Sequence, residues 1–234
     1  MFNIILQAST TVIDSSSADG GVAAGQVAEK MTLLQFFMKG GPLMIPLILL
    51  FIISLYIIIE RALTLSKLDK MDPNFMNNIK DYVSNGNLEA ARSLAKNTQT
   101  PVARLIDKGL KRLGKPLDNI SSSIENTGKL EISKMEKGLA TLATIAGAAP
   151  MLGFLGTVTG MINAFRAIAA SQTAVTPSML ASGIYEAMIT TVTGLVIGII
   201  AYLAYNFLIT KVEGIVYKME ASSVEFIDLL QEPA

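Results

Sequence analysis

The chain has 234 residues, of which 51% are hydrophobic and 16% charged, and its 19 Lys and Arg balance its 19 Asp and Glu. In soluble domains about a quarter of the residues are charged, so this chain is unusually apolar. A net charge of zero argues against nucleic-acid binding. The absence of Cys and His excludes disulfides and removes the commonest metal ligand and general base. No nucleophile–base pair is visible, so we expect no metal, no cofactor and no enzymatic activity.

Three stretches of the chain are almost free of charge. They lie at residues 40–59, 138–165 and 167–210, and the last contains one charge, Glu186. A transmembrane helix needs about 20 mostly apolar residues, whereas buried helices of a soluble bundle keep a polar face. The sequence therefore predicts an all-α membrane protein whose second and third spans extend into a helical domain. The predicted spans are residues 40–60, 138–166 and 179–210.

The segments between the spans differ in charge. Residues 61–137 hold 14 Lys or Arg against 9 Asp or Glu, and basic residues favour the cytoplasmic side. This predicts a cytoplasmic helical domain at 61–137, with its helix at 118–137 running on into the second span. The remaining segments are then an outer N-terminal segment at 1–39, an outer loop at 167–178 and a cytoplasmic C-terminal helix at 211–234.

Two smaller features each allow two interpretations. Apolar residues recur at helical spacing before the first span, at Val27, Met31, Leu34 and Met38. They predict a short amphipathic helix, which lies on the outer membrane surface or packs against neighbouring helices. A basic cluster occurs in the cytoplasmic domain, at Lys108, Lys111, Arg112 and Lys115. It is either a solvated face or a contact with anionic lipid headgroups.

Glu186 is the one charged residue inside a predicted span. A carboxylate is costly in a membrane and usually faces a bundle interior or a water path. We interpret it as a proton-handling or ion-coordinating group, with a structural, hydrogen-bonded carboxyl as the alternative. Counted from the helix ends, Thr157 reaches about the same depth of 13 Å, and Thr190 and Thr191 lie one turn further inward. These hydroxyls extend a candidate proton path or bond to their own backbone one turn back.

The second and third spans are rich in small residues, which let helices approach closely in a membrane. Helix packing is the expected role of Gly153, Gly156, Gly160, Gly194 and Gly198. One carboxylate per chain cannot form a series of proton carriers. Either several copies assemble around a pore, or another subunit supplies the second titratable group.

The two runs APMLGFLGTVTGMINAF (residues 149–165) and GIYEAMITTVTGLVIGIIAYLAYN (residues 183–206) carry a family resemblance. Together with the three-span layout and the large cytoplasmic segment, they resemble the MotA/TolQ/ExbB proton-channel family. The paired patterns P-x-x-G-x-x-G-T-V-x-G-M and G-I-x-E-A-x-x-x-T-x-x-G are specific in combination. By motif position, Thr157, Glu186 and Thr191 match the pore-lining Thr, Glu and Thr of the family.

The resemblance implies a motor subunit in the inner membrane of a double-membraned bacterium, with a periplasmic N-terminus and a cytoplasmic C-terminus. Family members form a ring, taken to be a pentamer, around two single-span ExbD-like partners whose membrane Asp carries the proton. Proton flow turns the ring relative to the partners, and this rotation energises an envelope-spanning protein.

Within the family, three spans and a long N-terminal segment resemble the ExbB branch more than the four-span MotA type or the TolQ type. In ExbB systems the envelope-spanning protein is TonB, which drives uptake of siderophore-bound iron and cobalamin. The segment 1–39 is low in charge and rich in Ser and Gly, unlike the enteric pattern. A TolQ-like or gliding-type motor subunit, or a non-conducting membrane scaffold, therefore stays open as an alternative.

Overall fold

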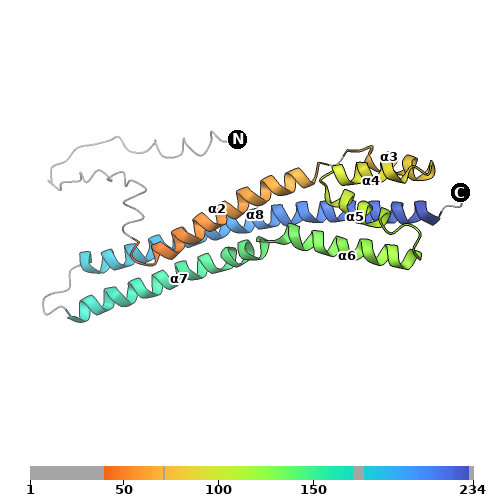
Figure 1. Ribbon diagram of the computed structural model, residues 1–234. Helices are drawn as coiled ribbons and strands as arrows, with labels where there is room; N and C mark the ends of the chain where they lie inside the picture. Colours follow the sequence, from red (N-terminus) through yellow and green to blue (C-terminus); the bar gives the residue numbers. More distant parts are fainter. Residues whose placement is uncertain (1–39, 71, 171–176, 232–234) are drawn as a thin grey trace, which may run out of the picture. The chain divides into compact units, whose positions relative to one another are not determined.

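The computed structural model describes residues 40–70, 72–170 and 177–231, and this part of the chain forms helices and no strand. The helices are α2 (Met44–Leu68), α3 (Phe75–Ser84), α4 (Leu88–Asn97), α5 (Pro101–Leu110), α6 (Leu117–Glu136), α7 (Leu139–Ala170) and α8 (Pro177–Gln231). Figure 1 shows α8 running beside α2, α7 and α6, which it also contacts. The predicted amphipathic helix before residue 39 and the centre of the loop at 167–178 lie outside the described residues.

Three helical stretches in this part of the chain are long and apolar enough to cross a membrane: α2, the stretch that contains α7, and α8 from Gly183. The prediction of an all-helical chain with three such helices is confirmed for the described residues. α8 has 55 residues, which corresponds to about 80 Å. Because the hydrocarbon core of a bilayer is about 30 Å thick, α8 extends well beyond its span.

The helix that the sequence predicts to run from residue 118 into the second span is interrupted in the structure. Lys137 leaves the helical conformation at φ −53° and ψ 127°, and Gly138 has φ +84°, a value that side chains disfavour. The interruption frees carbonyls at the end of α6. Arg61 of α2 occupies the break, where its guanidinium donates to the carbonyl of Lys134 at 3.2 Å.

In the region between the first and second spans, the short helices α4 and α5 begin at capping residues. The side chain of Asn87 accepts from the backbone N–H of Ala90 at 3.2 Å before α4. The hydroxyl of Thr100 accepts from the N–H of Ala103 at 3.3 Å before α5, and proline at position 101 is pre-organised for a first turn. These caps satisfy backbone donors that the helices leave free.

Beyond the spans, α5, α6 and the last third of α8 share a core of large side chains. Ile106, Leu110, Met219 and Phe226 are almost fully buried in it. The Phe226 ring packs so closely on α5 that a methyl group on Gly109 would come within 2.6 Å of its Cε1. Burial of apolar area therefore holds this region together.

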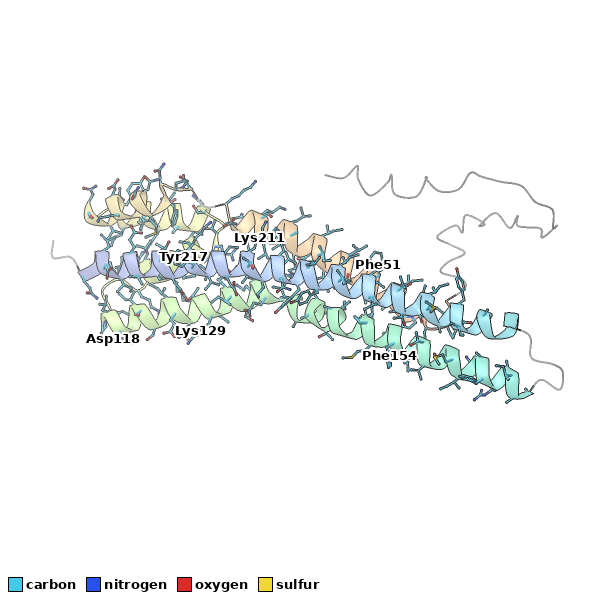
Figure 2. All side chains as sticks on the ribbon, turned by 180° about the vertical axis from the view of Figure 1, so that it is seen from behind. Phe51, Asp118, Lys129, Phe154, Lys211 and Tyr217 are labelled. Carbon is cyan, nitrogen blue, oxygen red and sulfur yellow. The ribbon has the colours of Figure 1, made fainter. Side chains whose placement is uncertain are left out.

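Polar contacts join the end of α2 to α8 where the two helices pass each other. The ammonium group of Lys211 donates to the hydroxyl of Ser66 at 3.1 Å, and Figure 2 shows this lysine beside α2. Two turns further along α8, Lys218 forms an ion pair with Asp69 at 2.6 Å. These contacts fix the end of the first span against α8.

The basic cluster of Lys108, Lys111, Arg112 and Lys115 lies at the connection from α5 to α6, at the end of α6 away from the spans. α6 has 20 residues, which corresponds to about 30 Å, whereas exposed charges are screened within about 8 Å at physiological salt. Lys111 also pairs with Asp107 at 2.5 Å. The geometry therefore favours a solvated face over contact with lipid headgroups.

Candidate functional site

The contact between α7 and α8 is built on small residues that bring the two backbones together. A methyl group on Gly194 would overlap the carbonyl of Ala149, and one on Gly198 would come within 2.6 Å of Pro150 Cγ. One on Gly160 would reach the Cβ of Ala187 at 2.7 Å. Gly153 and Gly156 face the same contact, next to Thr190 and Thr191. The structure thus places all five glycines expected to pack helices at this contact.

Two threonines of α8 make hydrogen bonds across or along this contact. The hydroxyl of Thr191 donates to the carbonyl of Gly153 on α7 at 2.7 Å. The hydroxyl of Thr190, which is 2% exposed, donates to the carbonyl of Ala187 at 2.8 Å and lies 3.5 Å from the carbonyl of Gly153. Because each hydroxyl is satisfied by a carbonyl, its lone pairs are left to accept from water or another donor.

Glu186 lies in a partly open cavity of about 200 Å³, the Glu186 pocket, which is lined by α7, α8 and the turn before α2. Its described lining residues come from the turn before α2 (Gly40, Pro42 and Leu43), from α7 (Leu155, Gly156, Thr159, Gly160 and Asn163) and from α8 (Glu186 and Thr190). The turn before α2 approaches most closely, since a methyl group on Gly41 would overlap the Glu186 carboxylate. The carboxylate thus shares this cavity with the hydroxyl groups of Thr159 and Thr190 and the amide group of Asn163.

The α7–α8 contacts determine which α7 residues lie level with Glu186. Gly160 faces Gly183 and Ala187, while Gly156 faces Thr190. Glu186 therefore lies level with residues 157–160 of α7, so the depth expected for Thr157 from chain counting agrees with the helix register.

Thr157 and Thr159 both lie near the depth of Glu186, but they lie on different faces of α7. Thr159 lines the Glu186 pocket, and Thr157 lies about 200° around α7 from it at 3.6 residues per turn. The hydroxyl of Thr157 donates to the carbonyl of Phe154 at 2.7 Å. Thr191 lies about 140° around α8 from Glu186 by the same geometry. In the single chain, Thr190 thus meets Glu186 in one cavity, and Thr157 and Thr191 lie on other faces.

Sequence reasoning missed Thr159, Asn163 and the turn before α2. The first two stand four residues apart on α7, a spacing that puts side chains on one helix face, and this spacing was a usable signal. The approach of residues 40–43 is a tertiary contact without a local signal. Among the described residues, no three of His, Cys, Asp and Glu come together as they would to hold a metal ion.

The structure defines a multi-pass helical membrane protein with a carboxylate held between its spans. Residues 97–221 match the MotA/TolQ/ExbB proton channel family, which is slightly more than half of the chain. The chain belongs to this family. Glu186, its pocket on α7 and α8, and the break at Gly138 all lie within the matched residues.

Similar proteins carry names from two branches of the family. The chain is 31% identical to the putative biopolymer transport protein ExbB homolog of Methanothermobacter thermautotrophicus, over 81% of this chain and 67% of that protein. It is 33% identical to the putative biopolymer transport protein ExbB-like 1 of Synechocystis, over 76% and 71% of the two chains. It is 38% identical to the Tol-Pal system protein TolQ of Haemophilus influenzae, over 44% and 45%. The chain is most like the ExbB proteins and is a subunit of the proton-channel type.

Proposed function

We propose that this chain is the ExbB-like motor subunit of a proton-driven complex in a bacterial inner membrane, and that it energises TonB-dependent transport across the outer membrane. The observation that supports this most strongly is the placement of Glu186. It is the one charged residue within the three apolar stretches, and it lies in a pocket lined by Thr159, Asn163 and Thr190. A carboxylate beside hydroxyl and amide groups is suited to accept and release a proton.

The proposal includes copies of this chain and a second kind of subunit. A single carboxylate needs another titratable group to receive its proton. An ExbD-like single-span partner with a membrane Asp, enclosed by a ring of five copies, would supply that group. Thr157 and Thr191 do not line the Glu186 pocket of their own chain, so in this proposal they face the partner or a neighbouring copy in the ring.

The proposed orientation follows from the charges of the segments between the spans. The excess of Lys and Arg in residues 61–137 favours the cytoplasm. The N-terminus and the link between α7 and α8 then lie in the periplasm, and the C-terminal end of α8 lies in the cytoplasm.

Transport by cells whose own copy of this gene is replaced tests the proposal. Glu186→Gln keeps the size of the side chain and removes its charge, and we expect it to abolish siderophore uptake while the complex still assembles. Glu186→Ala and Thr157→Val should have the same effect. Glu213→Gln, at an exposed position further along α8, is the matched control and should transport normally. Normal uptake in the Glu186 and Thr157 variants would contradict the proposal.

A TolQ-like role is the second candidate, supported by the 38% identity to the Tol-Pal system protein TolQ. The two roles differ in the envelope protein that the complex engages, which purification of the intact complex from crosslinked cells can identify. A TonB-like protein in the complex supports the first role, and a Tol component supports the second.

A further inference from the structure

One face of α7 carries polar residues from the end of the helix to the level of Glu186. That this face conducts protons rests on the proposed function. We propose that this face, with Thr159, Asn163 and Arg166, is a water-lined access route by which protons reach Glu186 from the end of the spans nearest Arg166. Asn163 is the positioning residue for the Glu186 carboxylate in this route.

The spacing of the three residues puts them on one side of α7. Thr159 and Asn163 are four residues apart and Asn163 and Arg166 are three, so successive side chains are neighbours on the helix surface. Arg166 lies one turn before the end of α7 at Ala170. In the other direction the same face continues with Leu155, which is apolar and lines the pocket. The polar face therefore begins at the helix end and stops level with Glu186.

The Glu186 pocket has the size and the polar groups that water needs. Its volume of about 200 Å³ is room for several water molecules, and a buried water typically has two to four polar partners. The hydroxyl of Thr159 donates to the carbonyls of Leu155 and Gly156 at 2.9 and 3.1 Å, so its oxygen is left to accept from water. An Asn amide both donates and accepts, so Asn163 can hold the carboxyl group in either protonation state.

The turn before α2 lines the pocket together with residues of α7 and α8. Gly41 has φ +67°, a conformation that favours glycine, and any side chain there would overlap the Glu186 carboxylate. The backbone of this turn thus passes directly against the carboxylate. The polar face of α7, which lines the same pocket through Thr159 and Asn163, is the path that we assign to water.

Thiol labelling tests the water route directly, because the chain has no Cys of its own. Asn163→Cys and Thr159→Cys place a thiol in the route. Met161→Cys is the matched control, at nearly the same depth but about 160–200° around the helix. A permanently charged methanethiosulfonate reagent is added to membranes that contain the whole complex, from each side in turn. The reagent reacts with the thiolate, which forms in water and not in lipid.

We expect both variants in the route to react at least about tenfold faster than Met161→Cys, because only their thiols ionise in water, and faster from the side nearest Arg166. Equal rates at the three positions would overturn the route. This labelling does not depend on proton transport. A failure of the proposed function, shown by normal uptake in Glu186→Gln, is therefore distinguishable from a failure of the route.

The positioning role of Asn163 needs a second readout. Asn163→Leu keeps a similar volume and removes the amide, so we expect reduced transport with a shifted pH profile, and Asn163→Gln should restore part of both. An unchanged pH profile in Asn163→Leu, or equal loss in Asn163→Gln, would overturn the role assigned to Asn163.

Discussion

α8 packs in two different ways along its length. Against α7 it uses glycines, so that backbone atoms of one helix meet backbone or small side chains of the other, as at Gly194 and Ala149. Against α5 and α6 it uses large buried side chains such as Met219 and Phe226. One continuous helix thus changes its packing chemistry between its apolar and its more polar part.

The difference follows from the surroundings of each part. In water, burial of a large apolar side chain is favourable because its surface leaves the solvent. In lipid this driving force is absent, so helices gain from close approach and from hydrogen bonds between them. The hydroxyl of Thr191, which donates to Gly153 at 2.7 Å, is such a bond. Substitutions of the same kind should therefore have different effects in the two parts.

The largest effect is expected in the region beyond the spans. Phe226→Ala removes a ring that is 0% exposed and should lower the free energy of unfolding by about 3–5 kcal/mol. Val224→Ala changes a side chain that is 61% exposed on the same helix and should have little effect. Thermal unfolding of the purified protein in detergent measures both, and equal losses would contradict the packing described for this region.

An intermediate effect is expected when one methyl group is added to a glycine at the α7–α8 contact. The added methyl group of Gly194→Ala would meet backbone atoms of Ala149 and Gly153, which cannot rotate away, so the protein should lose about 1–3 kcal/mol. Gly147→Ala is the matched control, because no atom lies within 4 Å of the added methyl group. The same unfolding measurement applies, and a loss in Gly147→Ala as large as in Gly194→Ala would refute the close approach.

The smallest effect is expected at the boundary between the two parts. Lys218 and Asp69 form an ion pair in which both side chains are 46% exposed. Lys218→Met should therefore lower stability by about 0.2–1 kcal/mol, and the difference from the unsubstituted protein should shrink at high salt because exposed charges are screened. A loss that is large and independent of salt would show that this contact is stronger than its exposure implies.

Much of the fold could be predicted from the sequence because the spans have almost no charge. The apolar runs at 40–59 and 138–165 predict helices of membrane length without any knowledge of packing. The break before α7 could not be predicted in this way. Residues 118–137 and the following apolar run both favour a helix, and the interruption depends on the conformation of Gly138 and on Arg61, which arrives from a distant part of the chain.

The candidate site shows a similar division. Glu186 could be identified because it is the one charge in its stretch, and its depth relative to α7 followed from helix rise. Which α7 hydroxyl shares its cavity could not be derived. Thr157 and Thr159 differ in depth by only about 3 Å, and the choice between them depends on the rotation of α7, which the glycine contacts with α8 determine.

The central proposal is that Glu186 is part of a proton pathway, and proton flux through the purified complex tests it most directly. The complex with its partner subunit is placed in vesicles that contain a pH indicator, and a membrane potential is applied. The account predicts acidification for the unsubstituted complex and for Glu213→Gln, and none above empty vesicles for Glu186→Gln. Flux through Glu186→Gln equal to that of the unsubstituted complex would contradict it.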